Sequence, residues 1–263
     1  MPYRIDLHDP PDEALDRLVT LGALDVELTP GGLAALLPDA VSPAAVARAL
    51  GRDRVSVSPA RGRDDDSVWI LTPRTVRTGR LVIVPAEIEA PPGALRLSDG
   101  PAFGTGLHAT TALCLDVLGE TLEAGTPAAV LDVGIGSGVL ALAALTLGVP
   151  HATGLDIDAE ALRIAAENAH ANGLAGRLQL VGGGPEAVDG AWPLVFANVV
   201  AAPLIDMAPT LVRRLRSGGR LVLSGFPESM ASEVERVYRR LGMRSFRSDS
   251  RGGWTALVLH PSW

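Results

Sequence analysis

The chain has 263 residues, 47% of them apolar and 4% aromatic, and a formal net charge of −7, with arginine as its only strongly basic side chain. An acidic chain is a poor match for phosphate backbones, so we expect no direct sequence-specific nucleic-acid binding. No apolar run reaches the roughly 18 residues of a membrane span, so we expect no membrane partner. The single cysteine, Cys114, excludes an internal disulfide framework and fits a cytoplasmic protein, and no Cys or His spacing predicts a metal site.

Residues 1–58 are predicted to form a small α+β domain of ferredoxin-like topology. Apolar patterning predicts strands at 3–7, 24–28, 33–37 and 55–58, and helices at 12–21 and 43–50. Ser42 and Pro43 are a typical cap and first turn for the second helix. The resulting βαββαβ order is the split βαβ arrangement. The charged segment 59–67 is predicted to be a linker.

Residues 68–263 are predicted to form an α/β domain with a Rossmann-like sheet. Short strands at 68–71 and 81–84 and a helix at 107–123 come first. Alternation then predicts strands at 128–133, 152–157, 177–181, 194–200 and 219–225, with helices at 137–148, 159–172, 203–216 and 229–241. Segments 244–248 and 254–260 flank a glycine-containing turn and predict a C-terminal hairpin that gives the sheet an antiparallel edge.

The turn after strand 128–133 is the main functional signal. It reads Val-Leu-Asp-Val-Gly-Ile-Gly-Ser-Gly over 130–138 and supplies four candidate cofactor-binding residues, Asp132, Gly134, Gly136 and Gly138. Asp156 ends the next strand, 22 residues after Gly134, close to the spacing of about 20 that a ribose-binding acid requires. Asp158 precedes a helix and is expected to cap it. The G-x-G-x-G spacing, preceded by Asp132, resembles the first motif of the S-adenosylmethionine-dependent methyltransferases with a Rossmann-like sheet, which implies S-adenosylmethionine as the cofactor.

Two more segments carry candidate site residues. The loop at 99–111 is rich in glycine and threonine and precedes a helix, which is typical of a ligand-binding loop. Its candidate cofactor contacts are Phe103, Gly104, Gly106 and Thr111, and its candidate catalytic residues are Thr105 and Thr110. His108 in the same loop is interpreted as a surface residue. Asn198 ends an apolar strand, where its amide can bind the cofactor or orient an acceptor amine; a turn-forming asparagine is the alternative.

Four runs, at 102–111, 132–138, 154–158 and 197–204, together resemble the PrmA-type bacterial methyltransferases, which modify the eleventh protein of the large ribosomal subunit. The resemblance covers about residues 80–263. It implies S-adenosylmethionine contacts at Thr111, Gly134, Asp156 and Asn198, and methylation of lysine ε-amino and N-terminal α-amino groups. It also implies that the N-terminal domain recognises this ribosomal protein, which belongs to the base of the ribosomal stalk. The order Gly100-Pro101 and the lone Trp69 near the domain junction depart from that family's pattern.

The residues alone leave three other functions open. A methyltransferase of the same fold can act on another protein or a small amine. A nicotinamide-dependent oxidoreductase uses a similar glycine turn, although its usual G-x-G-x-x-G spacing differs. A ligand-binding module without turnover is the third.

Overall fold

The computed structural model describes residues 1–64, 68–86, 88–98 and 104–263. The chain divides into two compact units, Met1–Pro73 and Arg74–Trp263. The clusters of buried apolar side chains follow the same division, because one lies between residues 5 and 50 and the other two lie between residues 81 and 259. Each unit therefore has a hydrophobic core of its own.

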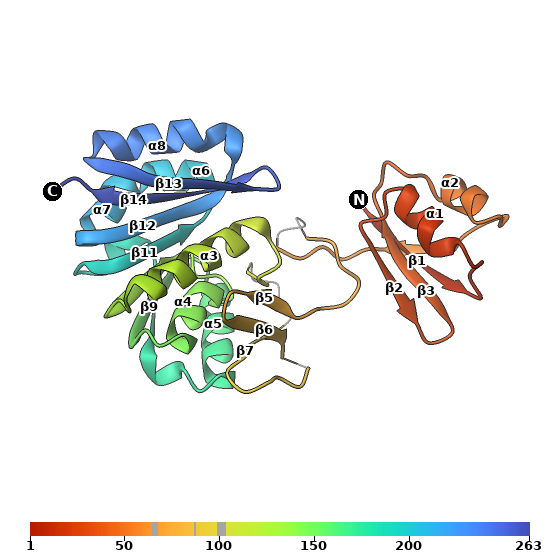
Figure 1. Ribbon diagram of the computed structural model, residues 1–263, viewed down its shortest axis with the longest axis horizontal. Coiled ribbons are helices and arrows are strands. Elements are labelled where there is room, and N and C mark those ends of the chain that lie inside the picture. Colours follow the sequence, from red (N-terminus) through yellow and green to blue (C-terminus); the bar gives the residue numbers. More distant parts are fainter. Residues whose placement is uncertain (65–67, 87, 99–103) are drawn as a thin grey trace. The chain divides into compact units, whose positions relative to one another are not determined.

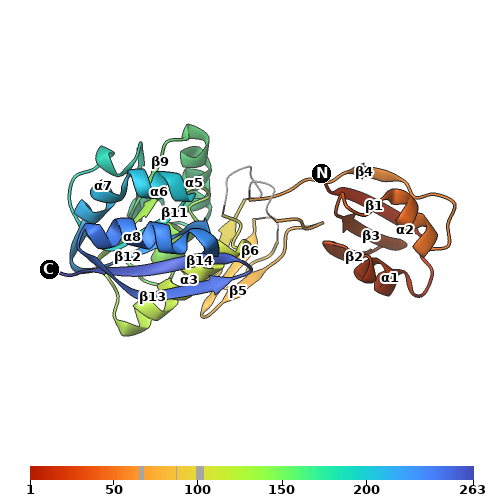
Figure 2. The ribbon, with the colours of Figure 1, turned by 90° about the horizontal axis from the view of Figure 1, so that it is seen from above.

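The first unit has the predicted βαββαβ order. Its elements are β1 (Tyr3–His8), α1 (Ala14–Thr20), β2 (Asp25–Thr29), β3 (Gly32–Leu37), α2 (Pro43–Ala49) and β4 (Val57–Pro59). The strands form an antiparallel sheet of order β2-β3-β1-β4, and both helices pack against one of its faces (Figure 2). Ser42 caps α2 as predicted, since its side chain accepts from the Ala45 N–H at 3.2 Å. The predicted fold of this small domain is confirmed.

A segment after the predicted linker lies along the opposite face of this sheet. Leu71 N donates to Asp25 Oδ2 at 2.8 Å, and Thr72 Oγ1 donates to Glu27 Oε1 at 2.6 Å. The strand predicted at 68–71 is therefore wrong, and its only described pairing is a single bridge between Val68 and Arg63. Carboxylates of β2 hold the segment through its backbone amide and hydroxyl, so it belongs to the first unit.

The second unit is built on a seven-stranded sheet. Its strands are β8 (Ala129–Val133), β9 (His151–Asp156), β10 (Leu178–Gly182), β11 (Trp192–Asn198), β12 (Leu215–Pro227), β13 (Met243–Arg251) and β14 (Trp254–Pro261). Their order is β10-β9-β8-β11-β12-β14-β13. The strands from β8 to β12 pair in parallel, whereas β14 pairs antiparallel with both β12 and β13. The predicted parallel sheet with an antiparallel C-terminal hairpin is confirmed.

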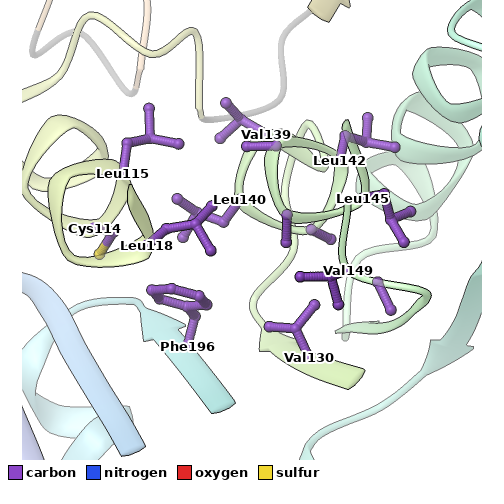
Figure 3. Packing of buried hydrophobic residues seen from close by; sticks show 14 of the residues in the cluster. Cys114, Leu115, Leu118, Val130, Val139, Leu140, Leu142, Leu145, Val149 and Phe196 are labelled. Atoms are coloured by element: carbon purple, nitrogen blue, oxygen red, sulfur yellow. The ribbon is translucent and has the colours of Figure 1, made fainter. Parts of the chain in front are cut away.

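Helices cover both faces of this sheet (Figure 1). Against one face lie α3 (Ala109–Ala124), α4 (Val139–Thr146) and α5 (Ala159–Ala171), and against the other lie α6 (Ala201–Asp206), α7 (Ala208–Arg213) and α8 (Ala231–Arg240). Seven successive residues of α4 are buried, as expected for a helix that is apolar all round. Leu118 and Leu140 converge on Phe196 beneath α3 and α4 (Figure 3).

Short elements complete the second unit. A three-stranded sheet of order β5-β6-β7 consists of β5 (Val76–Thr78), β6 (Leu81–Pro85) and β7 (Leu95–Leu97), and its apolar side chains join the core beside α3 and α4. Single 3-10 turns occur at η1 (Ala175–Arg177), η2 (Pro185–Ala187) and η3 (Glu228–Met230). The predicted helix 203–216 is wrong as one element, because it is divided into α6 and α7 around Met207.

Candidate cofactor site

Three predicted site residues meet where the strand order of the large sheet reverses. β8 lies between β9, which follows it in the chain, and β11, which comes later. Open α/β sheets bind ligands outside the carboxyl ends of the strands at such a switch point. Gly134 follows β8, Asp156 ends β9 and Asn198 ends β11. The topology therefore brings the glycine turn, the acid and the amide to one sheet edge.

The glycine turn has a conformation that L side chains rarely adopt. Gly134, Gly136 and Gly138 have φ angles of 74°, 54° and 86°. The N–H groups of Gly134 and Ile135 both donate to Leu155 O, at 2.8 and 2.9 Å, which ties the turn to β9. A Cβ on Gly134 would lie 2.3 Å from Val199 Cγ1. Glycine at position 134 therefore allows the turn after β8 to approach the turn after β11.

The Asp156 carboxylate supports this turn. Its Oδ2 accepts from Gly136 N at 3.0 Å and its Oδ1 accepts from Asp158 N at 3.0 Å. Each carboxylate oxygen has a second lone pair, so the group can still accept hydrogen bonds from a ligand. Asp158 caps α5 as predicted, by accepting from Glu160 N at 2.9 Å. The two neighbouring acids thus have different roles.

Three buried oxygens at this edge have no hydrogen-bond partner within the described part of the chain. They are Thr111 Oγ1, Asp132 Oδ1 and Asn198 Oδ1. An unsatisfied buried polar group costs about 1–3 kcal/mol, so such atoms require an explanation. All three accept hydrogen bonds. A ligand that carries N–H and O–H donors would satisfy them.

Asp132 lies between the sheet and α4. It is 1% exposed, and its Oδ2 accepts from Ala141 N at 3.1 Å. Burial raises the pKa of Asp132 to about 8; the Ala141 hydrogen bond opposes this shift and the nearby charge of Asp156 adds to it. At neutral pH the carboxyl group is therefore mostly protonated and can donate as well as accept a hydrogen bond.

The N-terminus of α3 places the loop candidates. His108 caps this helix: its Nδ1 accepts from Thr110 N at 3.3 Å and lies 2.7 Å from Thr110 Oγ1. The ring also meets Trp254 edge to face at 4.8 Å, so the interpretation of His108 as a surface residue is wrong. Thr105 Oγ1 accepts from Leu107 N at 3.2 Å. Phe103 lies outside the described residues.

Glycines of the same loop allow close approaches. Gly104 and Gly106 have φ angles of 108° and 86°. A Cβ on Gly104 would lie 2.7 Å from Ser137 Oγ in the glycine turn, and one on Gly106 would lie 3.0 Å from Ile83 Cδ1. Gly104 therefore lies directly beside the turn that follows β8.

Two exposed apolar side chains at this edge were not among the predicted site residues. Ile157 directly follows Asp156 and is 90% exposed, and Val200 comes two residues after Asn198 and is 65% exposed. Single exposed apolar residues are common on proteins, but these two flank the polar candidates. For Ile157, the sequence does hold a signal: an isoleucine between two acids at the end of a predicted strand.

A cysteine nucleophile, a metal site and a membrane-spanning helix find no support among the described residues. Cys114 is buried, and burial raises the pKa of its thiol far above the normal range. The described part of the chain holds no group of three or more His, Cys, Asp or Glu side chains placed to bind a metal ion. None of its helices has the length and apolar character needed to cross a membrane.

The strand order, the G-x-G-x-G turn, the acid after β9 and the amide after β11 define an S-adenosylmethionine-dependent methyltransferase with a Rossmann-like sheet. A family model described as ribosomal protein L11 methyltransferase (PrmA) matches residues 52–261. The chain belongs to this family.

Relatives agree with this assignment. The ribosomal protein L11 methyltransferase of Chromohalobacter salexigens is 44% identical over 201 residues, which are 74% of this chain and 66% of the relative. The protein of the same name from Pelotomaculum thermopropionicum is 39% identical and is matched over 82% of this chain and 72% of its own length. The chain thus spans about two thirds of the length of such relatives. The crystal structure of ribosomal protein L11 methylase from Lactobacillus delbrueckii subsp. bulgaricus superposes with a TM-score of 0.66 at 30% identity, covering 72% of this chain and 99% of that one.

The residues at the sheet edge fit S-adenosylmethionine. The cofactor has an ammonium group and ribose hydroxyls as donors, and the edge offers buried acceptors on Thr111, Asp132 and Asn198. Its sulfonium is positively charged, and the nearby Asp156 carboxylate suits a cation. The exposed Ile157 offers an apolar surface for a base.

Proposed function

We propose that this chain is an N-methyltransferase that uses S-adenosylmethionine to methylate amino groups of ribosomal protein L11, on lysine side chains and at the N-terminus. The names of its relatives, which are ribosomal protein L11 methyltransferases, support the substrate. The observation that carries the proposal is the meeting of Gly134, Asp156 and Asn198 at the switch point of the sheet.

The cofactor would be held by side chains and turns already described. Asp156 would accept hydrogen bonds from the ribose hydroxyls, in addition to those from Gly136 N and Asp158 N. Thr111 and Asp132 would pair with donors of the cofactor, and Ile157 would cover one face of the adenine. Gly134, Gly136 and Gly138 let the backbone come close, and Gly104 and Gly106 would form the opposite wall. When bound, S-adenosylmethionine supplies a methyl group on an electrophilic sulfonium.

Asn198 would orient the acceptor amine. Its Oδ1 is a buried acceptor without a partner in the described chain, so it can accept an amine N–H and direct the nitrogen lone pair. Positioning of two reactants can supply roughly 7–11 kcal/mol of the barrier. Thr105 and Thr110, at the start of α3, would shape the path of the incoming amine.

The acceptor must arrive as a free amine. A lysine ammonium with an ordinary pKa of about 10.4 carries a proton at neutral pH. Entry into a crevice bordered by apolar side chains such as Val200 favours the neutral form, because desolvation lowers the pKa of an ammonium. Loss of the proton to solvent then needs no dedicated base.

The first unit would recognise the protein substrate. It has its own fold and core and contributes none of the residues assigned above to the cofactor. A ribosomal substrate fits a cytoplasmic enzyme without direct nucleic-acid contacts.

Mass spectrometry tests this function directly. Purified L11 is incubated with the chain and S-adenosylmethionine that carries a deuterated methyl group. Because the chain contains no lysine, every labelled methyl-lysine must come from the substrate. We expect deuterated methyl groups on lysines and on the N-terminus of L11. Labelling of another protein or a small amine, with L11 unlabelled, would overturn the substrate assignment.

A further inference from the structure

A chain of buried and partly buried hydrogen bonds links four residues around the glycine turn. Asn168 Oδ1 accepts from Ser98 N at 2.8 Å and from Ser98 Oγ at 2.9 Å. Asn168 Nδ2 donates to Ser137 O at 2.8 Å. Ser137 Oγ in turn donates to Gly104 O at 2.7 Å. The order of the chain is thus Ser98, Asn168, Ser137, Gly104.

The four residues come from segments that the cofactor site needs together. Ser137 lies within the glycine turn, between Gly136 and Gly138. Ser98 and Gly104 are the described residues on either side of 99–103. Asn168 lies in α5 and is 1% exposed, and Ser137 is 4% exposed. Water therefore cannot easily replace either side chain in these bonds.

The amide of Asn168 suits this place chemically. One planar group uses an acceptor toward Ser98 and a donor toward Ser137 at the same time. Asn172, one turn later, provides a contrast: among the residues that the structure describes, its side chain bonds to the backbone of Arg96 and of Asn168. Both asparagines fix residues 96–98 to α5, but only Asn168 also reaches the glycine turn.

We propose that Asn168 is a positioning residue of the cofactor site. Its amide holds both Ser98 and the carbonyl of Ser137 in the glycine turn. The Ser137 hydroxyl in turn bonds to Gly104. The inference rests on the proposed function, because it requires that the turn bind S-adenosylmethionine. Loss of the Asn168 amide removes no proposed cofactor-contacting side chain but releases the glycine turn from α5 and from Ser98.

Calorimetric titration with S-adenosylmethionine tests the inference on the full chain. We expect Asn168→Ala to raise the Kd at least about tenfold, which corresponds to the ~1.4 kcal/mol of one well-placed hydrogen bond. Ser137→Ala loses the bond to Gly104 O and the 3.3 Å bond that Ser137 Oγ accepts from Val139 N, but it keeps the backbone carbonyl that Asn168 holds. It should raise the Kd in the same direction by less. The matched control Asn172→Ala should lower the Tm as Asn168→Ala does but keep the Kd within about twofold of the unaltered chain.

The outcomes separate this inference from the function on which it rests. No binding by the unaltered chain would overturn the proposed function. Binding by the unaltered chain, with an unchanged Kd in Asn168→Ala, would overturn the inference alone, and so would an equal rise in Kd in Asn172→Ala. If Asn168→Ala does not fold, the isosteric Asn168→Asp decides, because it keeps the acceptor toward Ser98 and removes the amide donor toward Ser137 O. A raised Kd then supports the link, and an unchanged Kd contradicts it.

Discussion

Asn198 and Asp156 both end parallel strands, but their hydrogen-bond surroundings differ and suit the two side chains to different roles. The Asp156 carboxylate is already held by two backbone N–H groups, which fix the position of its oxygens. Asn198 Oδ1 has no partner in the described chain and lies beside a turn that ends in the exposed Val200. This difference supports our proposal that Asp156 binds the cofactor and Asn198 the acceptor amine.

We predict that Asn198→Ala lowers kcat roughly 100-fold, the size of effect that a misplaced reactant can produce. The Kd for S-adenosylmethionine should rise less than tenfold, because Asp156 and the glycine turn remain. Steady-state methylation of L11 and calorimetry measure the two quantities. Equal losses in both would reduce Asn198 to a cofactor ligand.

Asp132 gives the stability of the protein a pH dependence. The pKa of its carboxyl group is about 8 in the folded chain and near 3.9 in an unfolded one. Between these values the folded state keeps a proton that the unfolded state has released. The contribution of Asp132 to the free energy of unfolding is therefore fully present below about pH 4. It decreases as the pH rises from there and is lost once the pH has risen through about 8.

Asp132→Asn removes this titration. Between about pH 6 and about pH 7.5, we expect the unaltered chain to lose roughly 1–2 kcal/mol more of its free energy of unfolding than the variant loses. Urea unfolding at the two pH values, without cofactor, measures the difference. Parallel losses in the two proteins would show that the buried carboxyl group does not titrate in this range.

At the scale of elements, β12 fixes the turn that follows β11. Val199 N donates to Ser224 O at 3.1 Å, and Gly225 has a φ angle of 95°. A Cβ on Gly225 would lie 2.4 Å from Val199 O and 2.7 Å from Val199 N. The backbone that presents Asn198 therefore presses directly against β12.

Gly225→Ala should both destabilise the chain and lower kcat by moving this turn. Gly218→Ala is the matched control in the same strand, because Gly218 has a φ angle of 71° and no atom within 4 Å of an added Cβ. Both variants lose about 1 kcal/mol through the strained backbone. We expect Gly225→Ala to lose a further ~1–3 kcal/mol from the collision. Equal urea midpoints and equal kcat values would contradict this account.

Long patterned elements could be predicted from the sequence, and so could the meeting of the site residues. Apolar strands followed by helices specify a parallel sheet, and the carboxyl ends of parallel strands share one edge. Gly134, Asp156 and Asn198 were therefore expected together. The caps at Ser42 and Asp158 follow from local chemistry alone.

Short or context-dependent features could not be predicted in the same way. β5 and β7 have three residues each, too few for a period to emerge. The apolar run at 68–71 looks like a strand, but carboxylates on β2 hold the end of that segment instead. The division between α6 and α7 had a local signal, since Pro209 has no N–H for a continuous helix. The burial of His108 depends on its ring contact with Trp254, which is 146 residues away in the chain and could not be foreseen from the local sequence.

On the scale of the whole molecule, we propose separate roles for the two units: cofactor binding in the second and substrate recognition in the first. The large core clusters and all the described candidate residues belong to Arg74–Trp263. We predict that residues 74–263 expressed alone bind S-adenosylmethionine with a Kd within about twofold of the full chain but methylate L11 much more slowly. Calorimetry and the deuterium assay measure both. Undiminished methylation by the shorter chain would remove the recognition role of the first unit.

The central claim is that the edge of the large sheet binds S-adenosylmethionine through Asp156. Isothermal titration of the full chain with this compound tests it most directly, beside the variant Asp156→Ala. We predict saturable heat for one site in the unaltered chain and a Kd raised about 10- to 100-fold in the variant, since hydrogen bonds to a charged group contribute about 1.5–3 kcal/mol. No heat in the unaltered chain, or the same Kd in both proteins, would contradict the account.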